Sequence, residues 1–172
     1  MNFKVFVCYS SKDEIRVDPV LRILKPITEL TCYFFKETRT VAKDTREDIL
    51  TNIRDSDAFL VFYSRDSKRS GYVQNEIGAA MGLGKQVIVC RLDKTKPKDM
   101  LDGVNYLDFY DPERCREELA RLVAWIQEKI GQRRALVPVK AATEKSFDWV
   151  NFLLLAVIIA GSLYLISGAG KK

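Results

Sequence analysis

The sequence contains no histidine, and this absence limits the chemistry that the chain can perform. It excludes Ser-His-Asp triads, Cys-His proteases and histidine-ligated zinc sites. Proton transfer and charge stabilisation must therefore rest on carboxylates, lysines, tyrosines or cysteines. The cysteines are scattered and include no C-x-x-C pair, so buried free thiols are a better interpretation than disulfides or a metal site. They are Cys8, Cys32, Cys90 and Cys115.

A tyrosine and a carboxylate, Tyr72 and Glu76, stand four residues apart. The apolar residues around them follow helical spacing, and residues four apart in a helix share one face. The buried stripe of this predicted helix is Val73, Ile77, Ala80 and Met81. The pair therefore places an aromatic ring one turn before a carboxylate. Taken alone, such a carboxylate is more often solvated, or paired with a cation such as Lys68 or Arg69, than catalytic.

Five short apolar runs predict the scaffold that positions these residues. The runs lie at residues 4–9, 31–35, 58–63, 86–92 and 104–110. Strands that are apolar throughout and alternate with helices are typical of a parallel sheet covered on both faces. The sequence thus predicts an α/β fold with a doubly wound, flavodoxin-like, five-stranded parallel sheet.

In a sheet of this kind, ligands bind outside the carboxyl ends of the strands, which directs attention to three loops. They are residues 9–14, 35–43 and 63–72. The polar segment within the last of them, residues 64–71, is predicted to be a loop before the next helix. No G-x-G-x-x-G motif occurs, so a dinucleotide site of the Rossmann type is not expected.

Several segments together resemble a Toll/interleukin-1 receptor (TIR) domain of the prokaryotic style. They are VFVCYSSKDE, REDILTNIRDSDAFLVFYS, and SGYVQNEIGAA followed by GKQVIVCRL. The resemblance covers about residues 3–130, and its most informative part is the order Ser70, Tyr72 and Glu76. Tyr72 stands where the family usually has tryptophan, and the loop TRTVAKD lacks the usual Pro-Gly.

Many TIR domains cleave NAD between nicotinamide and ribose, whereas others are non-catalytic assembly modules. The resemblance implies that Glu76 is the catalytic carboxylate and that Tyr72 packs against the nicotinamide. It also implies that NAD is a substrate, with no further cofactor and no metal. Five more side chains near the carboxyl ends of the strands are implied to contact the ribose or the phosphates. They are Ser10, Ser11, Arg39, Lys43 and Ser70.

From Trp149 to Gly170 the sequence contains no charged residue. This stretch is long enough, at ~1.5 Å per residue, to cross a hydrocarbon core of ~30 Å, and it predicts one C-terminal transmembrane helix. Basic residues are more frequent before the stretch than after it, which predicts a single-pass protein of the cell membrane with its N-terminal domain in the cytoplasm. The expected organisation is a TIR-like domain at 1–130, a basic juxtamembrane linker at 131–148, and a membrane helix with a short tail at 149–170.

The net charge of +5 belongs to the C-terminal part of the chain. Residues 1–130 carry 22 Lys+Arg against 21 Asp+Glu, whereas residues 131–172 carry 6 against 2. A nucleic-acid-binding surface needs basic residues spread over the folded domain. No nucleic-acid partner is therefore expected.

The sequence favours a membrane-anchored TIR-domain NAD glycohydrolase or cyclase that acts as a defence or cell-death effector. Its expected partners are NAD, membrane lipid and further copies of the chain, because TIR domains work as assemblies. Two alternatives stay open. One is a non-enzymatic signalling module that assembles at the membrane, and a weaker one is a nucleoside-processing transferase. The sequence does not separate hydrolysis from cyclisation.

Overall fold

The computed structural model describes residues 2–34 and 45–136. The strands in these ranges are β1 (Phe3–Cys8), β2 (Leu30–Phe34), β3 (Ala58–Tyr63), β4 (Gln86–Arg91) and β5 (Tyr106–Asp108). The α-helices are α1 (Glu14–Leu24), α2 (Thr45–Asp55), α3 (Arg65–Arg69), α4 (Gly71–Gly82) and α5 (Pro112–Leu136). Two short 3-10 helices are η1 (Ser11–Asp13) and η2 (Asp99–Leu101).

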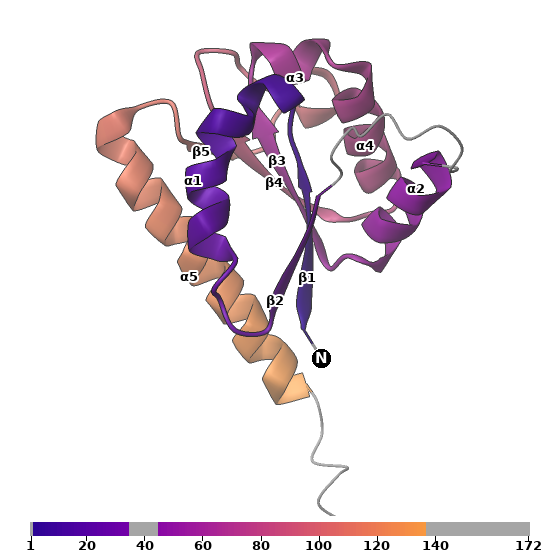
Figure 1. The fold of residues 1–172 in the computed structure, drawn as a ribbon, viewed down its shortest axis with the longest axis vertical. Coiled ribbons are helices and arrows are strands. Elements are labelled where there is room, and N and C mark those ends of the chain that lie inside the picture. The colour runs from indigo at the N-terminus through magenta and orange to yellow at the C-terminus, as the bar shows by residue number, and fades with distance from the viewer. Residues whose placement is uncertain (1, 35–44, 137–172) are drawn as a thin grey trace, which may run out of the picture. The chain divides into compact units, whose positions relative to one another are not determined.

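The described strands pair in parallel, in the order β2-β1-β3-β4-β5 (Figure 1). The chain passes from β1 to β2 on one side and then crosses to β3 on the other side of β1. At such a reversal of strand order, a crevice for ligands forms outside the carboxyl ends of the two strands. The five-stranded parallel sheet predicted from the sequence is confirmed, and its strand order reverses between β1 and β3.

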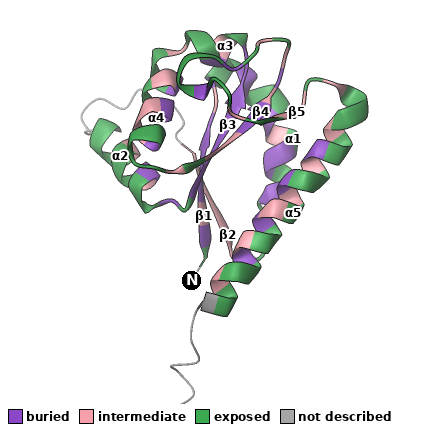
Figure 2. Cartoon of the chain, turned by 180° about the vertical axis from the view of Figure 1, so that it is seen from behind, coloured by how far each residue is buried: buried purple, intermediate pink, exposed green. Residues whose placement is uncertain are grey.

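Alternate residues of β1 supply two apolar cores, one on each face of the sheet. On one face Val5 and Val7 pack with α1 and α5, and on the other face Phe6 and Cys8 pack with α2 and α4. Strand β3 is buried along its whole length, as the purple ribbon in Figure 2 shows. Burial on both faces explains why its sequence is apolar throughout instead of alternating.

One local prediction is wrong, because the polar segment at residues 64–71 contains the helix α3. Ser64 caps this helix: its hydroxyl accepts the backbone N–H groups of Asp66 at 3.0 Å and Ser67 at 3.1 Å. The Ser67 hydroxyl in turn accepts the N–H of Ser64 at 2.6 Å. This reciprocal arrangement is a capping box, which satisfies the free donors of a helix start.

Helix α5 continues past residue 130 and ends at Leu136. In the part of the chain that the structure describes, no helix is both long enough and apolar enough to cross a membrane. The predicted transmembrane helix at residues 149–170 lies outside the described residues, as does the predicted linker beyond residue 136.

Candidate active site

Glu76 lies in the second turn of α4, the helix that begins at the carboxyl edge of the sheet. Ser70 caps this helix, and its Oγ accepts the N–H of Val73 at 3.4 Å. Val73 and Ile77 are buried against the sheet and fix the rotation of the helix. The Glu76 side chain is half-buried and interacts with Cys8, the last residue of β1. A carboxylate is thus held near the carboxyl end of β1, where the strand order reverses.

Burial raises the pKa of the Glu76 carboxyl above its usual value, because the charged form loses water. A hydrogen bond from the Cys8 thiol lowers this pKa in part. Full burial raises the pKa of the Cys8 thiol well above its usual value, and the nearby carboxylate adds to the effect. The thiol therefore stays protonated and acts as the donor. Within residues 2–34 and 45–136, no lysine or arginine, Lys68 and Arg69 included, forms an ion pair with Glu76.

Tyr72 lies one turn before Glu76 in α4, as the spacing predicted. Its side chain is 66% exposed, so one face of the ring is open to a ligand. Met81, which the spacing placed in the buried stripe, is 39% exposed. The buried face of α4 is therefore narrower than predicted and consists of Val73, Ile77 and Ala80.

Two of the three predicted substrate-binding serines cap helices at the carboxyl edge. Ser10 is buried, and its Oγ accepts the N–H of Lys12 at 3.4 Å at the start of η1. Ser70 caps α4 as described above. Ser11, in contrast, is exposed. The structure brings these serines to the same edge of the sheet as Glu76.

The two predicted substrate-binding cations, Arg39 and Lys43, lie outside the described residues. They belong to the segment between β2 and α2. Among the residues that the structure does describe, no group of three or more histidine, cysteine, aspartate or glutamate side chains is arranged to hold a metal ion.

The family of the chain follows from comparison with known proteins. Residues 5–123 match the family model of the TIR domain. The chain belongs to the TIR domain family. Its fold is similar to that of the TIR domain of the Toll-related receptor TRR-2 from Hydra magnipapillata, with a TM-score of 0.61 and 20% identity over 72% of this chain and 97% of that one. No protein of curated function matches the sequence.

A prokaryotic SEFIR domain is also similar to this TIR domain. The TM-score is 0.52 and the identity 16%, with 72% of this chain and 91% of that chain covered. Identities this low show a common fold and nothing about activity. The function of this TIR domain is therefore inferred from its own residues.

A buried hydrogen-bond network joins the loops at the carboxyl edge of the TIR domain, and the sequence did not predict it. Asp13, after β1, is 1% exposed. Its carboxylate accepts the hydroxyl of Ser64 at 2.5 Å and the guanidinium of Arg16 at 3.0 Å. Arg16 also donates to the carbonyl of Leu92, directly after β4. The loops that follow β1, β3 and β4 are thus bonded to one another.

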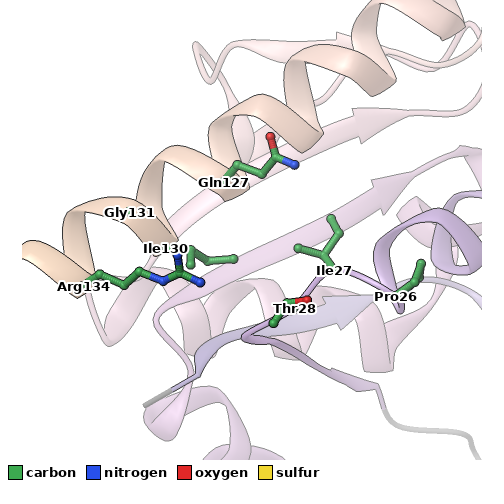
Figure 3. Close-up of a pocket in the computed structure, with 7 residues that line it drawn as sticks. All are labelled: Pro26, Ile27, Thr28, Gln127, Ile130, Gly131 and Arg134. Carbon is green, nitrogen blue, oxygen red and sulfur yellow. The ribbon is translucent and has the colours of Figure 1, made fainter.

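A cavity of about 480 Å³ lies at the opposite, amino edge of the TIR domain, between the α1–β2 turn and α5 (Figure 3). Its lining residues are Pro26, Ile27, Thr28, Gln127, Ile130, Gly131 and Arg134. The one charged group among them, Arg134, already bonds Glu29 at 2.6 Å. The lining contains no carboxylate to stabilise positive charge, so this cavity does not compete with Glu76 as the candidate active site.

We predict that Glu76→Gln stabilises the folded TIR domain near neutral pH. Because the pKa of Glu76 is raised on folding, the folded state binds the proton more tightly, and the free energy of unfolding falls as pH rises through that pKa. Glutamine has no charge to desolvate, so Tm should rise by about 1 to 4 °C at pH 7.5. Thermal melts across pH test this: the gain should shrink as the pH falls below about 5 and disappear at roughly pH 3, where the carboxyl is protonated in both states. An equal rise in Tm at every pH would show that the stabilisation has a cause other than the loss of the Glu76 charge.

Proposed function

We propose that this TIR domain cleaves NAD at the bond between nicotinamide and ribose, by hydrolysis or cyclisation, with Glu76 as the catalytic carboxylate. The observation that supports the proposal is the position of the Glu76 side chain. It is half-buried near the carboxyl end of β1, where the strand order reverses, and has no cation partner in the described residues. A carboxylate so placed is available to a positively charged substrate.

The chemistry of the bond suits a site without histidine. Nicotinamide leaves a cationic pyridinium as a neutral molecule, so no general acid has to protonate it. Positive charge then develops on the ribose, and a fixed carboxylate stabilises it more strongly in a partly desolvated site than in water. Glu76 supplies this charge and also an acceptor for ribose hydroxyls.

The remaining residues of the proposed site bind NAD. The exposed ring of Tyr72 packs on the nicotinamide, and the edge that carries Glu76 also presents hydroxyls and backbone groups to the ribose and phosphates. The serines proposed to make these contacts are Ser10, Ser11 and Ser70. The cations Arg39 and Lys43, which lie outside the described residues, are also proposed to bind the substrate. NAD is the substrate, and the reaction needs no resident cofactor or metal.

The proposed enzyme is anchored in the cell membrane by residues 149–170, with the TIR domain in the cytoplasm. The support is the uncharged stretch and the excess of basic residues before it. Consumption of NAD at this place would make the protein a defence or cell-death effector.

We predict that protease added to intact cells leaves the TIR domain uncut, because the domain lies in the cytoplasm. The same protease should digest the domain once the cells are permeabilised. Digestion of the domain in intact cells would show that it lies outside the cell, opposite to the predicted orientation.

One assay separates the proposal from its alternatives. The full-length protein is incubated with NAD and, in parallel, with nucleosides, and the released base is measured. Nicotinamide release supports the proposal. Base release from nucleosides alone would favour a nucleoside-processing transferase, and no release from either would favour a signalling module in which copies of the TIR domain assemble.

A further inference from the structure

The carboxylate of Asp13 lies where three loops meet, and its bonds continue toward α4. Ser64, which donates to Asp13 at 2.5 Å, uses the same hydroxyl to accept the N–H groups of Asp66 and Ser67. Asp13 therefore orients the group that caps α3. Asp13, Ser64 and Ser67 are all buried, so water does not compete for these bonds.

Helix α3 is in turn bonded to α4. The N–H of Ser70 donates to the carbonyls of Asp66 at 3.0 Å and Ser67 at 3.2 Å. The side-chain amide of Gln74 donates to the carbonyl of Ser67 at 3.1 Å. Gln74 precedes Glu76 by two residues. An unbroken series of hydrogen bonds thus leads from the loop after β1 to the helix that carries Glu76.

We propose that Asp13 is a positioning residue: through Ser64 and α3 it sets the separation between the β1 loop, residues 9–13, and Glu76 on α4. The inference rests on the proposed function of Glu76. A substrate bound between this loop and α4 would contact residues of both. A misplacement of about 1 Å can then cost up to ~100-fold in rate, even when the cause lies away from the reacting atoms.

The pair between Asp13 and Arg16 is by itself a weak source of net stability. The attraction within a buried ion pair is largely offset by the loss of water around the charges. The partner Arg16 is 43% exposed, which weakens the attraction further. The same domain offers a matched control at the amino edge. There Asp57 accepts the N–H of Lys4 at 2.8 Å and pairs with Arg133, far from the proposed site along the strands.

The test compares Asp13→Asn with Asp57→Asn in the full-length protein. Each variant loses one carboxylate charge from an ion pair and keeps the side-chain shape. Partial unfolding lowers the number of active molecules, and with it the apparent kcat, but leaves KM unchanged. We expect Asp13→Asn to raise the KM for NAD about fivefold and to lower kcat/KM about tenfold. Asp57→Asn, which removes a carboxylate from an ion pair away from the proposed site, should leave KM unchanged.

A second readout does not depend on activity. Hydrogen exchange of the amides at residues 70–76 should become about tenfold faster in Asp13→Asn and stay unchanged in Asp57→Asn. If the wild-type protein releases no nicotinamide, the proposed function fails while exchange still reports whether Asp13 positions α4. Unchanged KM and unchanged exchange in Asp13→Asn would overturn the inference.

Ser64→Ala keeps the test open if Asp13→Asn does not fold. It removes the donor to Asp13 and leaves the pair between Asp13 and Arg16 in place. The same rise in KM and the same faster exchange are expected. Loss of the folded state in both variants would overturn the inference, because the network would then be needed for the fold itself and not for the position of α4.

Discussion

Replacement of Glu76 by glutamine is expected to lower NAD turnover at least ~100-fold while the domain stays folded. One fixed group that stabilises charge in the transition state typically contributes ~3 to 4 kcal/mol to catalysis. Glutamine keeps the shape and the hydrogen-bonding oxygen of the side chain but removes its negative charge. The measurement is nicotinamide release by purified full-length protein at saturating NAD, so that a change in kcat is separated from a change in KM.

Two further variants test whether the loss of turnover is specific to the negative charge at position 76. Glu117→Gln removes an exposed carboxylate from α5 and should leave turnover unchanged. Glu76→Asp keeps the charge but shortens the side chain by one methylene group, and its turnover should lie between that of the wild type and that of Glu76→Gln. Circular dichroism spectra must match throughout, and no variant may melt below the wild type, since Glu76→Gln itself is expected to raise Tm by about 1 to 4 °C. Wild-type turnover in a folded Glu76→Gln protein would remove this residue from catalysis.

The centre of the sheet was predictable because β1 and β3 are buried on both faces. The run at residues 58–63 coincides with β3 (Ala58–Tyr63), since an entirely apolar segment of that length has few other stable positions. The helix with Tyr72 and Glu76 followed from the spacing of apolar residues. Met81 shows the limit of that reasoning, because a residue at the edge of a stripe can face either the core or solvent.

The network around Asp13 was not predictable from local patterns. Asp13 and Ser64 are 51 residues apart, and their contact depends on the pairing of β1 with β3. An aspartate two residues after a serine pair is ordinarily a solvated turn residue. The capping box of α3 left a weaker signal, because Ser67 takes the place of the usual glutamate or glutamine. Long-range contacts of this kind become visible only in the folded arrangement.

The last prediction links the proposed anchor to activity, and it rests on the expected self-association of TIR domains. Helices in a membrane hold their domains in one plane and raise the local concentration, which reaches the millimolar range for short tethers. A weak contact between domains, absent in dilute solution, would then form at the membrane. Truncation after Leu136 keeps every element that the structure describes and removes the predicted anchor.

The truncated domain at about 1 µM should therefore turn over NAD roughly 100-fold more slowly than the full-length protein in liposomes. Its rate should rise faster than linearly with protein concentration, because the active species contains more than one copy. Clustering of the truncated domain on liposomes through an engineered tag should restore the rate. Glu76→Gln in the clustered domain should abolish NAD turnover again, which would show that the restored activity depends on the same site. A specific activity that is constant over a hundredfold dilution and unchanged on liposomes would contradict assembly, and the anchor would then determine only where NAD is consumed.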